Sequence, residues 1–183
     1  RVGTSSVRRA AQTLAARPDV AVRPLRGNVD TRLRKALTEE YDAIIVAAAG
    51  VLRLGMGDRI TQYLPPEVCL PEAGQGALAV QTRADDVATS RLAAVIDDAP
   101  TRRAVTAERA AVTALGGGCT VPIAALAVIR GAELELQGLV ASADGKRLVR
   151  AKVMGKADAA EQAGKDLALK LLEMGANEIL NGT

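Results

Sequence analysis

Two neighbouring arginines, Arg8 and Arg9, fall in the first turn of a predicted helix that follows the hydroxyl cluster Thr4-Ser5-Ser6. The amino-terminal end of a helix already carries about half a positive charge and favours Asp or Glu. A bound anion would remove this conflict, because free backbone N–H groups, the hydroxyls of Thr4 and Ser6 and both guanidinium groups could converge on a carboxylate or phosphate. The alternative is an ordinary serine cap with two solvated arginines, and this stretch alone does not decide between them.

Two later stretches repeat the arrangement. In PLRGNVDTRLRK, Arg26 precedes a Gly-Asn turn and Arg32 follows on the next predicted helix, which either Asn28 or Asp30 would cap. In AAAGVLRLG, Arg53 comes one turn after a strand of the buried type, although a plain surface arginine is the alternative there. Ligands of open α/β sheets bind beyond the carboxyl ends of the strands, where all three stretches fall. The pattern predicts an anion site built from arginines.

Cys119 directly follows three glycines in the stretch LGGGCT, so little shields its sulfur. The chain contains no histidine, which excludes Ser-His and Cys-His nucleophile pairs and imidazole metal ligands. Permanent attachment of a group to Cys119 is therefore a more economical role than repeated nucleophilic attack, with simple packing as the alternative. The other cysteine, Cys69, lies between Val68 and Leu70, and we expect a buried small hydrophobe. The two cysteines lack the spacing of a metal site, and no metal is expected.

Composition restricts the class of protein. The 183 residues are 49% hydrophobic, as in globular proteins, and no apolar run approaches the ~20 residues that a membrane span needs. The start lacks a signal-peptide pattern, so we expect a cytoplasmic location. The first 60 residues hold eleven Arg and Lys against six Asp and Glu, which indicates an anionic partner. Two tyrosines and no Phe or Trp leave little for nucleic-acid bases to stack on, so small carboxylates or phosphates fit better.

The first part of the chain alternates strand and helix patterns, which predicts βαβ units and an α/β domain. Prolines then interrupt the pattern, and Gly74-Gln75-Gly76 indicates a tight crossover. The elements expected are a helix over 7–16, a strand over 20–22, a helix over 31–40, a strand over 43–49, a strand over 77–82 and a helix over 85–97.

A second unit starts near Pro100. A helix ends at Gly116, and three β-type runs are joined by the hairpin turns Arg130-Gly131 and Asp144-Gly145. An amphipathic helix with Gly175 after it closes the chain. The order helix, three strands, helix predicts a small α+β domain with a three-stranded antiparallel sheet. Its elements are expected over 101–115, 123–129, 134–141, 147–153 and 159–173.

Six stretches, in this order and spacing, resemble the porphobilinogen deaminase (hydroxymethylbilane synthase) family over essentially the whole chain: GTSSVRRAAQ, LRGNVDTRLRK, YDAIIVAAAGVLRLG, LPEAGQGALAVQTR, TAERA and LGGGCTVPI. The resemblance implies a transferase of tetrapyrrole (porphyrin and heme) biosynthesis. Such an enzyme joins four porphobilinogen molecules head to tail, releasing ammonia each time, to give the linear hydroxymethylbilane.

The resemblance also implies a covalent cofactor and a set of binding residues. Cys119 matches the family cysteine that holds a dipyrromethane through a thioether, which primes the growing chain. Each pyrrole carries an acetate and a propionate, and bidentate arginine forks suit these carboxylates. The matching cofactor- and substrate-binding residues are Thr4, Ser6, Arg8, Arg9, Arg26, Arg32 and Arg53.

For the fold, the resemblance implies a periplasmic-binding-like α/β domain over residues 1–72, the family's second domain. Residues 73–98 then match a crossover strand and helix that belong to the first domain, and residues 99–183 match the C-terminal α+β domain. No residue here matches the family's catalytic aspartate, which lies in an N-terminal domain preceding the match, and Arg1 is not a methionine, as expected for the interior of a longer protein. We therefore expect no turnover by this chain alone, a monomeric full-length enzyme, and an exposed edge or a swapped partner at 77–82.

Two other classes of function stay open from the residues. A non-catalytic carboxylate-binding module would explain the arginines but would leave Cys119 without a role. A nucleic-acid binder would use the basic first third of the chain, and its binding would weaken steeply with salt.

Overall fold

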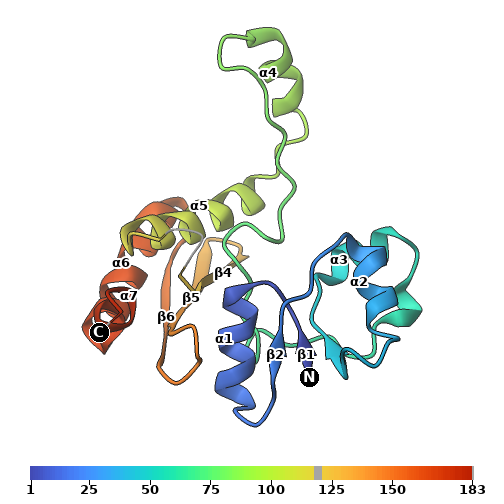
Figure 1. Ribbon diagram of the computed structural model, residues 1–183. Coiled ribbons are helices and arrows are strands. Elements are labelled where there is room, and N and C mark those ends of the chain that lie inside the picture. Colours follow the sequence, from blue (N-terminus) through green and yellow to red (C-terminus); the bar gives the residue numbers. More distant parts are fainter. Residues whose placement is uncertain (118–120, 183) are drawn as a thin grey trace.

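A computed structural model describes residues 1–117 and 121–182 of the chain. The first part contains a parallel sheet of order β2-β1-β3, made of β1 (Val2–Gly3), β2 (Val22–Arg23) and β3 (Ala43–Ile44) (Figure 1). Val2 lies opposite both Val22 and Ala43 in the two registers. The predicted α/β arrangement with parallel strands is confirmed, although each strand is only two residues long.

Three helices follow these strands. α1 (Val7–Ala16) has the predicted bounds, and the Ser6 side chain accepts a hydrogen bond from the Arg9 backbone N–H at its start. α2 (Val29–Lys35) is capped by Asn28, and α3 (Ala48–Arg53) is followed by a 3-10 turn, η1 (Gly57–Arg59).

Three expectations for this part are wrong in extent, and the first is the strand over 20–22, which is observed at Val22–Arg23. The predicted strand over 43–49 ends at Ile44, because the alanines that follow are good helix formers and start α3 at Ala48. The predicted helix over 31–40 ends at Lys35, where the Thr38 hydroxyl donates to the Lys35 carbonyl over 2.7 Å and replaces the helical continuation.

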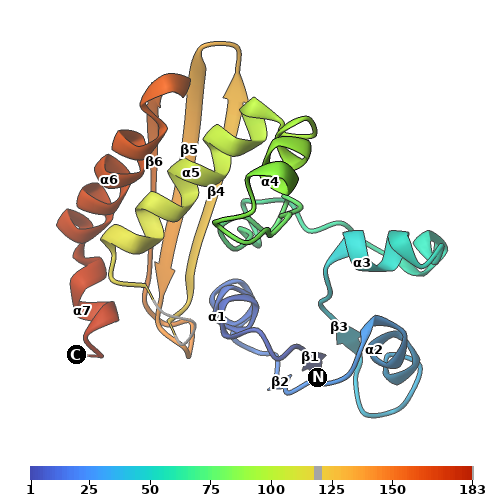
Figure 2. The ribbon, with the colours of Figure 1, turned by 90° about the horizontal axis from the view of Figure 1, so that it is seen from above.

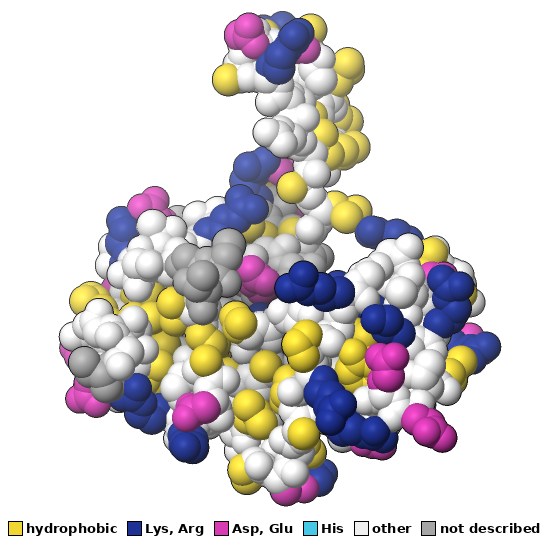
Figure 3. All heavy atoms as spheres, viewed as in Figure 1, with side chains coloured by type: hydrophobic (Ala, Val, Ile, Leu, Met, Phe, Trp, Pro, Cys, Tyr) yellow, Lys and Arg dark blue, Asp and Glu magenta, His cyan; other side chains and the backbone are white. Residues whose placement is uncertain are grey.

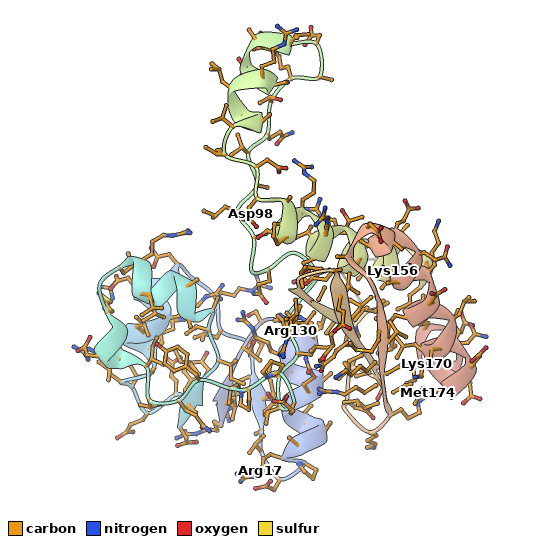
Figure 4. The ribbon with its side chains drawn as sticks, turned by 180° about the vertical axis from the view of Figure 1, so that it is seen from behind. Arg17, Asp98, Arg130, Lys156, Lys170 and Met174 are labelled. Atoms are coloured by element: carbon orange, nitrogen blue, oxygen red, sulfur yellow. The ribbon has the colours of Figure 1, made fainter. Side chains whose placement is uncertain are left out.

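Residues 77–97 form an arm that projects from the rest of the molecule and carries α4 (Val87–Ala94), capped by Asp86 (Figure 1). The strand predicted over 77–82 is absent from the described structure, because no neighbouring strand there supplies the ladder of hydrogen bonds that a strand needs. Its apolar side chains remain exposed instead, and Leu78 is 83% exposed. Asp98, at the base of the arm in Figure 4, accepts a hydrogen bond from the Thr101 N–H and caps the next helix.

The C-terminal part matches the predicted α+β domain to within a few residues. β4, β5 and β6 form an antiparallel sheet in sequence order, with Arg130 opposite Glu133 at one hairpin and Ala141 opposite Leu148 at the other. Figure 2 shows the two long helices, α5 and α6, lying next to each other across the strands. The elements are α5 (Ala99–Ala114), β4 (Ile123–Arg130), β5 (Glu133–Ala141), β6 (Leu148–Lys156), η2 (Ala157–Ala159), α6 (Ala160–Leu171), the π-helix η3 (Leu172–Ala176) and α7 (Asn177–Leu180).

Most of the hydrophobic core lies between this sheet and its helices. Leu134, Leu136, Leu167 and Leu171 are completely buried there. Gly164 lets α6 approach α5 closely, because a Cβ at this position would lie 2.5 Å from the Ala107 carbonyl oxygen. The described part of the chain contains no helix with the length and apolar character needed to cross a membrane.

A smaller core joins the two parts. Ala11 of α1 and Leu70 pack against Ala124 of β4 and Leu139 of β5. The hairpin turn between β5 and β6 also contacts α1, since a Cβ on Gly145 would lie 2.5 Å from the Ala11 carbonyl oxygen. Gly145 also has a positive φ of 72°. Both contacts fix α1 relative to the C-terminal sheet.

Candidate functional site

A cavity of about 610 Å³ lies between the start of α1, the crossover segment after Leu70 and the end of α5. This size is within the range of roughly 300–1,000 Å³ of small-molecule sites. Residues from both parts of the molecule line this cavity. The lining residues are Ser5, Ser6, Val7, Arg8, Glu72, Ala73, Arg109, Val112, Thr113, Gly117, Val121 and Ile123.

Arg8 is the most deeply buried charged residue of this cavity, with 4% of its surface exposed. Its Nη1 donates to the Leu70 carbonyl oxygen over 2.6 Å, and its Nη2 donates to Gln75 Oε1 over 3.0 Å. Its Nε has no hydrogen-bond partner in the described structure. A buried donor without a partner costs free energy, so a ligand oxygen that reached Nε would be stabilised there.

The crossover segment that Arg8 contacts is held from both sides. Gln12 accepts from the Leu70 N–H over 2.7 Å and donates to the Leu70 carbonyl over 3.1 Å. On the other side, the buried Glu108 carboxylate accepts from the backbone N–H of Gly74 over 2.6 Å and from that of Ala127 over 2.8 Å. Burial raises the pKa of Glu108, while its two backbone hydrogen bonds oppose that change. This side of the cavity is thus a rigid segment.

The hydroxyls at the start of α1 already have partners in the loop. Ser6 lines the cavity and caps α1. Thr4 is buried and its Oγ1 accepts from the Ser6 N–H over 3.2 Å, and Thr4 is not among the lining residues. Ser5, which the sequence did not single out, both donates to and accepts from the Leu25 backbone over 2.9 Å and lines the cavity.

Two further predicted arginines lie close together, since Arg9 feels the charges of both Arg8 and Arg32. The Arg9 Nη1 donates to the Ile45 carbonyl at the end of the third strand, over 3.4 Å. Burial lowers the pKa of Arg9, and the positive charges of Arg8 and Arg32 lower it further. Arg32 itself donates through Nε to the Gly27 carbonyl over 2.8 Å. Positive charge therefore gathers at the carboxyl ends of the parallel strands, as the sequence predicts.

The last two predicted arginines lie apart from the cavity. Arg26 and Arg53 are exposed and do not line it. Neither forms a hydrogen bond or ion pair within residues 1–117 and 121–182. Arg53 is the sixth and last residue of α3, because the apolar run that precedes it is divided between β3 and α3.

Cys119 lies outside the described residues. Gly117 and Val121, on either side of the segment that contains it, both line the cavity. Gly116 ends α5 with a positive φ of 69°, and a Cβ on Gly117 would lie 2.9 Å from the Val112 carbonyl oxygen. Glycine is thus favoured at both positions by the backbone itself, through the positive φ at Gly116 and the close approach of the Val112 carbonyl at Gly117.

Cys69 is only half-buried, so the expectation of a fully buried residue is wrong. The neighbouring Leu70 is the completely buried residue of this run, and its backbone is hydrogen-bonded to Gln12.

Among the lining residues that were not predicted, Glu72 and Arg109 are charged, and Ser5 and Thr113 carry hydroxyls. Arg109, Val112 and Thr113 follow the i, i+3, i+4 spacing of one helix face, which is a signal that the sequence does contain. That α1 and the crossover lie opposite this face is set by tertiary packing, which the spacing does not specify.

Comparison with known proteins agrees with this geometry. A family model described as "Porphobilinogen deaminase, dipyromethane cofactor binding domain" matches residues 1–91, and one described as "Porphobilinogen deaminase, C-terminal domain" matches residues 102–173. The porphobilinogen deaminase of Desulforudis audaxviator is 52% identical over 98% of this chain and 58% of its own length. That of Roseiflexus castenholzii is 50% identical over 100% of this chain and 60% of its own length. The chain thus spans somewhat more than half the length of these relatives, and it belongs to the porphobilinogen deaminase family.

Proposed function

We propose that this chain is the cofactor- and substrate-binding part of a hydroxymethylbilane synthase. The reaction would be the head-to-tail condensation of four porphobilinogen molecules with release of ammonia, in tetrapyrrole biosynthesis. A dipyrromethane bound through Cys119 would prime it. Family membership and the cavity next to the segment that contains Cys119 support this proposal.

The residues of the cavity fit a carboxylated pyrrole. Val7, Val112 and Val121 offer apolar surface to a flat ring, and the unpartnered Nε of buried Arg8 offers a donor to a carboxylate. When bound, the dipyrromethane would supply the pyrrole end to which porphobilinogen units are added. The buried, unpartnered donor of a residue that lines a cavity of suitable size is the observation that carries the proposal, because a guanidinium N–H is buried at a cost that a ligand anion would offset.

The roles proposed for the remaining predicted residues follow from their burial and from their positions in the fold. Arg9 and Arg32 would raise the positive potential at the strand ends and attract further carboxylates. Ser6 would contribute at the helix start, and the buried Thr4 would hold the loop in shape. Arg26 and Arg53 are exposed and would meet the later units of a lengthening chain.

We also propose the finer division of the chain given by the resemblance. Residues 1–72 would form a periplasmic-binding-like domain, 73–98 a crossover that belongs with a further domain, and 99–183 the C-terminal domain. The exposed apolar side chains of the arm support the second assignment. We expect the full-length enzyme to be a cytoplasmic monomer, and we expect the 183 residues alone to release no ammonia from porphobilinogen, because none of them matches the family's catalytic aspartate.

Intact-protein mass spectrometry tests the proposal. The chain, produced in a host whose own enzymes make tetrapyrroles, should carry an added mass equal to two linked pyrrole units. A Cys119→Ser variant should lose this mass, whereas the matched control Cys69→Ser should keep it. An unmodified wild-type chain, or an added mass that survives Cys119→Ser, would contradict the proposal.

A further inference from the structure

Part of the cavity lining comes from the C-terminal domain. Arg109, Val112 and Thr113 of α5 form this part of the lining, on one face of the helix. Arg8 on α1 and Arg109 on α5 thus line the same cavity from two domains, although 101 positions separate them in the sequence.

Arg109 lies close to the crossover segment. Its Nε and Nη2 would be 3.8 and 3.9 Å from a Cβ on Gly74, so its guanidinium group lies next to this glycine. Within the part of the chain that the structure describes, Arg109 forms no hydrogen bond and no ion pair. Its charge is therefore available to a ligand in the cavity.

Within the described residues no carboxylate forms an ion pair with Arg109, although its positive charge opposes the rise in the pKa of the adjacent Glu108. Both oxygens of Glu108, the preceding residue, accept hydrogen bonds from the backbone N–H groups of Gly74 and Ala127. Glu72 is the one carboxylate among the described lining residues, against the two cations Arg8 and Arg109. The lining thus keeps an excess of positive charge.

Other arginines of α5 show that this placement is particular to Arg109. Arg102 forms an ion pair with Asp97 at the base of the arm. Arg103 and Arg109 are both exposed, but only Arg109 lines the cavity. Arg103 is therefore a suitable control for Arg109, because it is an arginine of the same helix that does not line the cavity.

We propose that Arg109 is a ligand-positioning residue that binds one carboxylate of the pyrrole while Arg8 binds the other. A pyrrole dicarboxylate has two anionic groups, and the cavity is lined by one arginine from α1, one arginine from α5 and apolar side chains such as Val112. A bound ligand would then connect the C-terminal domain to α1 across the cavity. This inference rests on the proposed function, since it takes the ligand of that function as given.

Binding of porphobilinogen to the 183-residue chain, measured by isothermal titration calorimetry, tests the inference. The chain is purified from a host unable to make porphobilinogen, and its unmodified mass is verified first. Arg109→Gln should weaken binding about tenfold, as expected for loss of a charge-assisted hydrogen bond. Arg109→Lys should restore part of the affinity, because it keeps the charge without the bidentate fork. The control Arg103→Gln should bind within about twofold of wild type.

The outcomes separate the two proposals. If the wild-type chain and Arg103→Gln bind and Arg109→Gln binds equally well, the inference is wrong while the proposed function stands. If the wild-type chain shows no binding, the proposed function of the cavity fails and the inference fails with it. A purely structural role is recognised by a lowered unfolding midpoint of Arg109→Gln with no recovery of affinity in Arg109→Lys, and this result would also overturn the inference.

Discussion

The C-terminal domain and the first 98 residues differ sharply in how they are stabilised. The C-terminal strands are eight and nine residues long and enclose completely buried leucines such as Leu134 and Leu167. The strands of the first part have two residues each, and the arm that follows exposes large apolar side chains, with Val95 82% exposed (Figure 3). The C-terminal domain is therefore stabilised by its own core. The first 98 residues instead leave arginines and apolar side chains exposed at the surface.

The candidate site lies where these two regions meet. The crossover that carries Glu72 is fixed to α1 through Gln12 and to α5 through Glu108. The less well packed region thus gains a rigid edge from the better packed one at the cavity. Rigid support of this kind reduces the entropy lost when a ligand binds.

The largest expected effect tests whether the C-terminal core dominates stability. Leu134→Ala removes a completely buried side chain and should lower the free energy of unfolding by about 2–5 kcal/mol. The control Val80→Ala, in the arm where Val80 is exposed, should change it by less than about 0.5 kcal/mol. Urea unfolding followed by circular dichroism measures both, and similar losses in the two variants would show that the regions are equally packed.

The same contrast explains which elements the sequence predicts. The hairpins at Gly131 and Gly145 and the helix end at Gly116 carry strong local signals, and all three glycines adopt positive φ as expected. Their flanking strands alternate in a pattern that the core of the same domain satisfies. Local and tertiary preferences agree there, so the predicted bounds are nearly correct.

Elements that depend on distant partners are predicted less well. The apolar run over 43–49 has the composition of a buried strand, but only Ala43 and Ile44 find a neighbour, through β1. Residues 77–82 have a strand pattern without a neighbouring strand in the described structure. The local sequence indicates that a segment can form a strand, whereas strand formation also requires a neighbouring strand with which to pair.

The candidate site follows the same rule. Arg8 was predicted from a local conflict between its charge and a helix start, and it does line the cavity. Arg109 has no such local conflict, and its place in the cavity depends on how α5 packs against the crossover. Thr4 has a suitable hydroxyl, but the loop buries it. Residue type therefore predicts candidates, and packing selects among them.

The next expected effect concerns the junction between the two regions. Gln12→Ala would leave the buried Leu70 N–H and carbonyl without the Gln12 side chain, and the free energy of unfolding should fall by about 2 kcal/mol. Gln162→Ala on α6 removes only an exposed contact with Asp166 and should cost less than about 0.5 kcal/mol. Urea unfolding compares the two variants, and equal midpoints would mean that the crossover is not held through Gln12.

A smaller effect depends on pH. Because burial raises the pKa of Glu108, the folded protein keeps this proton to higher pH than the unfolded chain does. The stability contributed by that proton is fully present below the ordinary glutamate pKa and is lost as the pH rises through the raised value. Glu108→Gln should lower the free energy of unfolding by about 1 kcal/mol near pH 7, since one backbone N–H loses its acceptor.

The pH series itself distinguishes the charge from the hydrogen bonds. Urea unfolding of wild type and Glu108→Gln from pH 4 upward, at about one-unit steps, should show that the wild-type advantage is greatest at low pH and declines as Glu108 ionises. Other carboxylates titrate in both proteins and cancel in the difference. A wild-type advantage that grew with pH would mean that the two backbone hydrogen bonds outweigh burial and that the pKa of Glu108 is lowered instead.

The smallest expected change in stability belongs to the arm. Leu92 and Val95 are 74% and 82% exposed, so the double variant Leu92→Ser, Val95→Ser should change the free energy of unfolding by less than about 0.5 kcal/mol. Exposed apolar side chains favour association, so the same variant should reduce concentration-dependent self-association in size-exclusion chromatography. Arg91→Gln, an exposed polar change on the same helix, is the matched control and should alter neither property. A loss of stability as large as that of Gln12→Ala would show that the arm packs against the molecule and that the contrast between the two regions ends before residue 77.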